Sequence, residues 1–144
     1  MTKPIYHTLL NATQPQVAVL VDPDKQTPAA LEQLAVQAQN CKVDYFFVGG
    51  SLLMNDSFEQ TIQVLKKHSS IPVVIFPGNN YQVSAAADAI LLLSLISGRN
   101  PEYLIGQHVV AAPAIKAAGL EVIPTGYLLI EGGRISTTSY ITQT

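Results

Sequence analysis

The segment Asp22-Pro23-Asp24-Lys25 groups two carboxylates and an ammonium within four residues. It follows directly on the apolar run 17–21, which predicts a strand buried on both faces. Pro23 has no backbone N–H and ends the hydrogen-bond ladder, so we expect the Asp22 carboxylate to project from the carboxyl end of that strand. Ligand sites of α/β folds lie at that end of the strands, which makes Asp22 and Lys25 candidate binding residues.

A second segment with chemical potential, Gly49-Gly50-Ser51, closes the next predicted strand. The Asp22 carboxylate and the Ser51 hydroxyl are oxygen donors, and they suit Mg²⁺ when water and phosphate oxygens complete its shell. Gly49 and Gly50 carry no side chain that would keep a diphosphate away from the backbone. The two segments together predict a magnesium site at Asp22 and Ser51, with Lys25, Gly49 and Gly50 beside a diphosphate.

Each segment also has a simpler interpretation. Asp-Pro-Asp is an ordinary turn sequence, in which Asp24 caps the turn and Lys25 pairs with it. Gly49-Gly50 can be a tight strand exit only, since the spacing of a phosphate loop or a dinucleotide fingerprint is missing. Two further polar or glycine-containing strand ends, at 77–80 and 94–98, favour a site, because the carboxyl ends of parallel strands meet at one rim.

Composition narrows the possible partners and function classes. The net charge is -2 and the basic residues are scattered, which predicts no nucleic-acid partner. The longest apolar stretch, 85–96, is shorter than the ~20 residues of a spanning helix, so we expect no transmembrane segment. A single cysteine, Cys41, and the lack of a secretory signal favour the cytoplasm. Two function classes are excluded because the motif that each requires is missing. A receiver domain needs a carboxylate after the third strand, where this sequence has Phe76-Pro77-Gly78, and a serine hydrolase needs a Gly-x-Ser-x-Gly elbow.

Strand and helix signals alternate along the chain. The predicted strands are 17–21, 43–48, 71–76, 89–95 and 121–130, and the predicted helices are 27–40, 56–68, 83–87 and 100–118. The segment 135–141 is predicted to pair back on the fifth strand as a hairpin. This order predicts a parallel α/β sheet. Two architectures fit it: a complete five-stranded doubly wound domain, and the first half of an eight-stranded barrel.

Five segments together resemble the geranylgeranylglyceryl phosphate synthase family, and they occur in the family's order. They are LVDPDK at 20–25, VGGS at 48–51, PVVIFPGN at 72–79, NPEYLIGQH at 100–108 and PTGYLL at 124–129. The leucine before Asp-Pro-Asp-Lys and the Thr-Gly-Tyr-Leu-Leu form are similar to the group that includes bacterial members of the Bacteroidetes type. The resemblance covers nearly the whole chain.

The resemblance implies a TIM (β/α)8-barrel prenyltransferase of ether-lipid biosynthesis, with this chain covering about the first five strands. Such an enzyme joins the hydroxyl of sn-glycerol 1-phosphate to C1 of geranylgeranyl diphosphate and releases diphosphate. In the family, the aspartate after the first strand and the serine or threonine after Gly-Gly bind Mg²⁺, which are Asp22 and Ser51 here. The metal neutralises the departing diphosphate as the allylic C–O bond breaks.

Family features of the later strands have no counterpart in the 144 residues. Among them are the glutamate that takes the glycerol proton and the glycine-rich loops that hold the glycerol phosphate. We therefore expect residues 1–144 to be the N-terminal part of one TIM-barrel domain, inactive alone, with a homo-oligomer or a complementing C-terminal fragment covering its open sheet edges. The alternative is a small, self-sufficient α/β domain that binds a ligand without catalysis.

Overall fold

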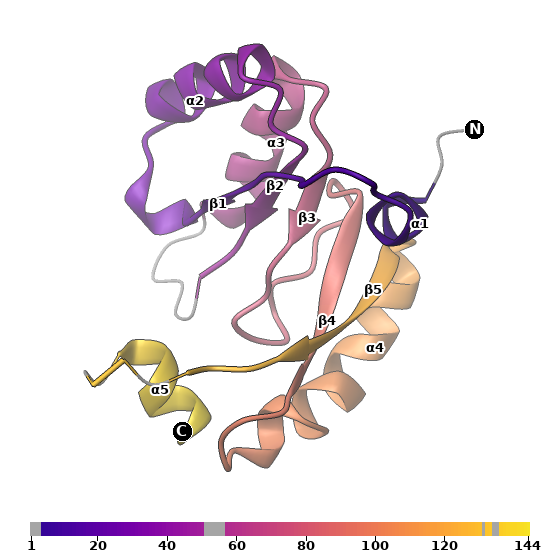
Figure 1. Cartoon of the computed structure of the whole chain (residues 1–144), viewed down its shortest axis with the longest axis vertical. Coiled ribbons are helices and arrows are strands. Elements are labelled where there is room, and N and C mark those ends of the chain that lie inside the picture. The colour runs from indigo at the N-terminus through magenta and orange to yellow at the C-terminus, as the bar shows by residue number, and fades with distance from the viewer. Residues whose placement is uncertain (1–3, 51–56, 131, 134–135) are drawn as a thin grey trace.

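The alternating apolar segments form one sheet of five parallel strands (Figure 1). The computed structural model describes residues 4–50, 57–130, 132–133 and 136–144. The strands are β1 (Ala18–Val21), β2 (Tyr45–Val48), β3 (Val73–Ile75), β4 (Ala89–Leu95) and β5 (Glu121–Tyr127). The sequence predicted all five, and the boundaries of β4 agree with the prediction.

The helices lie between the strands and at the two ends of the chain. They are α1 (Ile5–Leu10), α2 (Pro28–Asn40), α3 (Phe58–His68), α4 (Gly106–Ala118) and α5 (Thr137–Thr142), with 3₁₀ turns η1 (Pro23–Lys25) and η2 (Pro101–Tyr103). Thr27, the first residue of the predicted helix 27–40, caps α2, and its Oγ1 accepts a hydrogen bond from the Ala30 N–H at 3.3 Å. Gly119 ends α4 in the left-handed conformation, with φ at 67°.

The order of the strands in the sheet decides between the two predicted architectures. Neighbouring strands follow the chain order β1-β2-β3-β4-β5, without a crossover that reverses direction. A doubly wound sheet reverses its strand order at a switch point, whereas a barrel adds each strand beside the one before it. The sheet is therefore a half-barrel. Within the described residues, no strand pairs with the outer edge of β1 or of β5.

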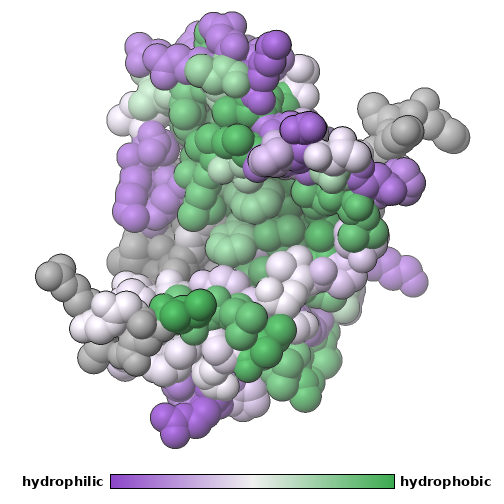
Figure 2. Space-filling model, in the orientation of Figure 1, coloured by the Kyte–Doolittle hydropathy of each residue, from purple (hydrophilic) through white to green (hydrophobic). Residues whose placement is uncertain are grey.

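The sheet buries apolar side chains on two faces, and successive residues alternate between them. On β3, Val73 and Ile75 pack against the helices, whereas Val74 points to the inner face. The inner face also holds Tyr45, Ala89, Leu91 and Ile123, with Ile5 of α1 packed on them. Figure 2 shows hydrophobic side chains across the hollow on this side of the molecule.

β1 departs from the prediction of a strand buried on both faces. Val21 is 1% exposed and packs on the helix side, but Leu20 on the other face is 59% exposed. The apolar run is typical of an interior strand, but among the described residues β1 lies at an edge of the sheet and nothing covers Leu20 on the inner side.

The C-terminal segment contradicts the predicted hairpin. Residues Thr137–Thr142 form α5, and every strand pair among the described residues is parallel. Ser136 and Ser139 form a capping box, in which the Ser139 N–H donates to Ser136 Oγ at 3.0 Å and the Ser136 N–H donates to Ser139 Oγ at 2.7 Å. This local cap overrides the strand preference of the β-branched threonines and isoleucine.

Two other predictions need correction. Residues 83–87 form turns rather than a helix, because only isolated hydrogen bonds such as that from the Ala87 N–H to Ser84 O hold them. Asn100 caps the turn η2, and α4 begins only at Gly106. Pro113 lies inside α4 without interrupting it. The predicted helix start at Asp56 lies outside the described residues.

Helix α1, which the sequence did not predict, closes the amino end of the inner face. Its short sequence carries no capping side chain of its own. The Glu121 carboxylate, at the start of β5, accepts the Ile5 N–H at 2.7 Å and the Tyr6 N–H at 2.8 Å. A carboxylate is a favourable partner for the free amides of a helix N-terminus. None of the described helices combines the length and the apolar character needed to cross a membrane.

Candidate functional site

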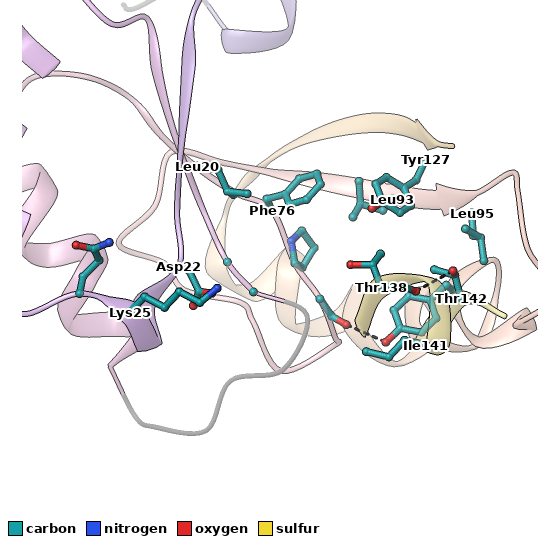
Figure 3. Close-up of a pocket in the computed structure, with 16 residues that line it drawn as sticks. Leu20, Asp22, Lys25, Phe76, Leu93, Leu95, Tyr127, Thr138, Ile141 and Thr142 are labelled. Atoms are coloured by element: carbon teal, nitrogen blue, oxygen red, sulfur yellow. Dashed lines mark hydrogen bonds and ion pairs between the residues drawn. The ribbon is translucent and has the colours of Figure 1, made fainter. Parts of the chain in front are cut away.

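A cavity of about 550 Å³ opens at the carboxyl ends of the strands (Figure 3). Figure 3 shows Asp22 and Lys25 at one end of it and side chains of α5 at the other, with Leu20 and Phe76 between them. Its lining comes from all five strands or the loops after them, and from α5, so that segments far apart in the sequence meet here. The residues are Leu20, Asp22, Lys25, Gln26, Gly49, Gly50, Phe76, Pro77, Gly78, Leu93, Leu95, Tyr103, Tyr127, Thr138, Ile141 and Thr142.

The charged end of the cavity is built by the turn that ends β1. Asp22 Oδ1 accepts a hydrogen bond from the Asp24 N–H at 3.2 Å, and Asp22 Oδ2 lies 2.8 Å from Lys25 Nζ. Asp22, rather than Asp24, is thus the capping residue of the turn. Ser57, at the start of α3, anchors the turn by donating to Pro23 O at 3.2 Å. The Asp22 carboxylate therefore both caps the turn and lines the cavity.

Lys25 holds its proton more firmly than a free lysine. The hydrogen bond to Asp22 and the negative charge of that carboxylate raise the pKa of the Lys25 ammonium. The Lys25 side chain is 77% exposed, and this ion pair holds it at the cavity. An anionic group that enters the cavity can compete with Asp22 for this ammonium.

The glycine segment after β2 lies against the loop after β3. A Cβ at Gly49 would lie 1.9 Å from the carbonyl oxygen of Phe76, so only glycine allows this approach. The Gly49 N–H donates to Val21 O at 3.1 Å, and the Gly50 N–H points to Gln82 Oε1 at 3.4 Å. Close packing alone is enough to explain a glycine at position 49, which agrees with the interpretation of Gly49-Gly50 as a tight strand exit. Both glycines also line the cavity.

The remaining wall is apolar and aromatic. The rings of Phe47 and Phe76 stack with centroids 6.1 Å apart, and Phe76 meets Tyr127 edge to face at the same distance. Leu93 and Leu95 of β4 continue the wall toward α5. Tyr103 of η2 donates its hydroxyl to Gly78 O at 3.0 Å, and burial raises the pKa of that hydroxyl.

The structure brings together four of the five predicted site residues. Asp22, Lys25, Gly49 and Gly50 all line the same cavity. Ser51 lies outside the described residues. Three α5 side chains that line the cavity, Thr138, Ile141 and Thr142, were not predicted, because the segment 135–141 was expected to form a hairpin. The leucines of β4 gave no signal of their own, because 89–95 is apolar almost throughout and shows no alternation that marks the inward face.

Mg²⁺ is the metal that the family resemblance implies, and the described residues fit it through one carboxylate. They contain no cluster of three or more His, Cys, Asp or Glu side chains that could cage an ion. Mg²⁺ is commonly bound by one or two carboxylates together with water and substrate phosphates. Asp22, with 28% of its side chain exposed on the cavity, suits that mode of binding once Lys25 moves aside.

Comparison with known proteins places this site in a family. The sequence matches the model of the PcrB family over residues 11–144. The chain belongs to the PcrB family. Among curated relatives it is 57% identical over 127 residues to a geranylgeranylglyceryl phosphate synthase of Chitinophaga pinensis, and 50% identical over 127 residues to one of Spirosoma linguale. Both matches cover 88% of this PcrB-family chain but 50% and 51% of the relatives, so the chain spans about half the length of the curated relatives it matches.

A solved structure agrees with the fold of this PcrB-family chain. It is the (S)-3-O-geranylgeranylglyceryl phosphate synthase of Thermoplasma acidophilum in complex with its substrate sn-glycerol-1-phosphate. The two are 28% identical with a TM-score of 0.88, and the match covers 99% of this chain and 58% of the other. Together with the strand order, this confirms the predicted fold class, a half-barrel made of the first five strands of a TIM barrel.

Proposed function

We propose that this protein is a prenyltransferase that joins the hydroxyl of sn-glycerol 1-phosphate to C1 of geranylgeranyl diphosphate. The observation that carries the proposal is the cavity itself, which has a charged, glycine-containing end and a long apolar wall. A prenyl diphosphate has the same two parts, an anionic head and a hydrocarbon tail. The names of the curated relatives and the ligand of the Thermoplasma acidophilum structure support the same pair of substrates.

In the proposed reaction, the hydroxyl oxygen forms a bond to C1 while the bond from C1 to the diphosphate oxygen breaks. The diphosphate leaves with the electron pair, and the hydroxyl loses its proton. Lys25 Nζ offers positive charge near the departing diphosphate, and the aromatic wall from Phe76 to Tyr127 excludes water from the allylic carbon. We assign no proton acceptor among the described residues.

We propose that Asp22 holds Mg²⁺ against the diphosphate oxygens, with Ser51 as the second protein ligand that the resemblance implies. When bound, the metal would neutralise charge on the leaving diphosphate. The protein's own contribution is to present the Asp22 carboxylate at the cavity. The turn η1 holds this carboxylate in place, because Asp22 Oδ1 accepts the hydrogen bond that caps the turn.

We also propose that another polypeptide covers the inner face, either a second copy or a complementing C-terminal fragment. The support is the 59% exposure of Leu20 and the edges of β1 and β5, which no described strand pairs with. Light scattering over a range of protein concentrations tests this, both for the chain alone and for the chain mixed with the remaining half of the Chitinophaga pinensis synthase. A chain that stays monomeric alone and forms no complex in the mixture would refute it. The cytoplasmic location stays a prediction.

Binding and turnover test the prenyltransferase proposal separately. Equilibrium binding of radiolabelled geranylgeranyl diphosphate to the 144-residue chain should depend on its diphosphate and weaken when EDTA removes Mg²⁺. Turnover is followed as ether lipid extracted after incubation with labelled sn-glycerol 1-phosphate, both for the chain alone and for the chain mixed with the remaining half of the Chitinophaga pinensis synthase. Product in either reaction supports the proposal. Binding without product in either reaction is the outcome expected of a non-catalytic domain. The absence of both binding and product would refute the proposed function.

A further inference from the structure

Gln82 is a polar side chain buried behind the charged end of the cavity. It is 1% exposed, and both ends of its amide are hydrogen-bonded. Its Oε1 accepts from the Gly78 N–H at 3.2 Å and from the Gly50 N–H at 3.4 Å, and its Nε2 donates to Gly50 O at 2.8 Å. Burying an amide is costly unless such bonds are made, so this side chain is held in one orientation.

These bonds join two loops that belong to different strands. Gly50 follows β2, and Gly78 follows β3. The last backbone hydrogen bond between the two strands runs from the Phe76 N–H to Val48 O at 2.9 Å. Beyond that point the Gln82 amide takes the place of a neighbouring peptide group, since it bonds both the N–H and the C=O of Gly50. A primary amide has the same donor and acceptor as a peptide unit.

Gln82 acts on the cavity without touching its contents. Gly50 and Gly78 line the cavity, whereas Gln82 does not. The same Oε1 lies 3.0 Å from where a Cβ on Gly49 would be, so the side chain also packs against the glycine segment. Without the amide, Gly50 would lose a partner for each of its backbone groups, and the two loops would lose a connection that sets their separation.

We infer that Gln82 is a positioning residue, which fixes the glycine loops at the polar end of the cavity in the arrangement that receives the diphosphate. The inference rests on the proposed function. Gln82 lies behind the binding residues and acts on the cavity through the backbone of Gly50 and Gly78.

Two substitutions separate this role from a general effect on folding. Gln82→Met keeps the length of the side chain and removes all three hydrogen bonds. Gln82→Glu keeps the acceptor for both amides, but at about pH 8 its second oxygen faces Gly50 O without a proton, whereas at about pH 6 burial favours the protonated carboxyl, which can donate there. Gln33→Glu, at an exposed position on α2, is the matched control.

Dissociation constants are measured for geranylgeranyl diphosphate and for geranylgeraniol, which lacks the diphosphate. Compared with the unchanged chain at the same pH, Gln82→Met should weaken binding of the diphosphate about tenfold and leave geranylgeraniol within about twofold. Gln82→Glu should show the same loss at about pH 8 and recover at about pH 6. Gln33→Glu should bind both ligands as the unchanged chain does. Equal weakening of both ligands, or no recovery of Gln82→Glu, overturns the inference.

Hydrogen exchange of the Gly50 and Gly78 amides, measured without ligand, distinguishes failure of this inference from failure of the proposed function. Both amides should exchange faster in Gln82→Met than in the unchanged chain. If the unchanged chain neither binds geranylgeranyl diphosphate nor gives product with the complementing half, the proposed function is refuted, and with it the diphosphate role of Gln82. If the unchanged chain binds and the two amides stay protected in Gln82→Met, only the role of Gln82 is refuted. Should Gln82→Met fail to fold, the pH recovery of Gln82→Glu decides.

Discussion

Replacing Gly49 with alanine would place a methyl group inside the backbone of the neighbouring strand. The added Cβ would lie 1.9 Å from the carbonyl oxygen of Phe76 and 2.8 Å from its carbonyl carbon, where ordinary contact begins at 3.4 Å. Neither atom belongs to a side chain that can rotate away. The chains after β2 and β3 would have to separate by roughly 1.5 Å, across the bond from the Phe76 N–H to Val48 O. We expect Gly49→Ala to lower the free energy of unfolding by about 3 kcal/mol.

Two other glycines provide matched controls for this prediction. Among the described residues, a Cβ at Gly132 would meet no atom within 4 Å, and one at Gly126 would meet the end of the Ile96 side chain, at 2.6 Å. Ile96 is 64% exposed and can change rotamer. Urea unfolding followed by circular dichroism should show Gly132→Ala within about 0.5 kcal/mol of the unchanged chain, and Gly126→Ala between the other two. A Gly49→Ala chain as stable as Gly132→Ala would refute the reasoning from contact distances.

Three further perturbations have defined outcomes. Asp22→Asn should weaken the binding of geranylgeranyl diphosphate about tenfold with Mg²⁺ and little with EDTA, and equal Mg²⁺ dependence of the two chains would remove Asp22 from the proposed site. Burial raises the pKa of the Tyr103 hydroxyl, so its contribution to stability is complete below the unfolded value of 10.0 and is lost as the pH rises through the folded value. The urea midpoint should therefore fall less steeply in alkali for Tyr103→Phe than for the unchanged chain, and parallel curves would contradict this. Glu121→Ala should cost about 1 kcal/mol of unfolding free energy, because two helix amides lose their acceptor, and an unchanged urea midpoint would exclude that role.

Local signals predicted those elements whose ends carry strong punctuation. Thr27-Pro28 and Gly119 mark helix ends that the structure reproduces, because a cap or a left-handed glycine acts within a few residues. Helix α1 could not be predicted in this way, since its amides are capped by Glu121 from the far end of the chain. The hairpin predicted for 135–141 was wrong because the strand-forming composition of this segment outweighed the local signal of the Ser136 cap.

The candidate site followed from topology more than from any single motif. Parallel strands place their carboxyl ends at one rim, so Asp22, Lys25, Gly49 and Gly50 could be grouped before their geometry was known. Sequence alone could not assign Gln82, because a glutamine in a polar loop gives no sign that it will be buried and bonded to two strands' loops. The choice between the doubly wound domain and the half-barrel also required the strand order, which depends on how each helix returns the chain to the sheet.

The bond between Glu121 and α1 has a consequence for the order in which the chain assembles. It joins residues 116 positions apart, whereas each strand from β1 to β4 pairs with the strand that follows it in sequence. During synthesis, the first four strands can therefore pair as they emerge, while α1 has no carboxylate to dock on until residue 121 has left the ribosome. We therefore expect α1 to be made first but to dock only after the strands that it covers have paired, with the amino end of the inner face open to solvent until then.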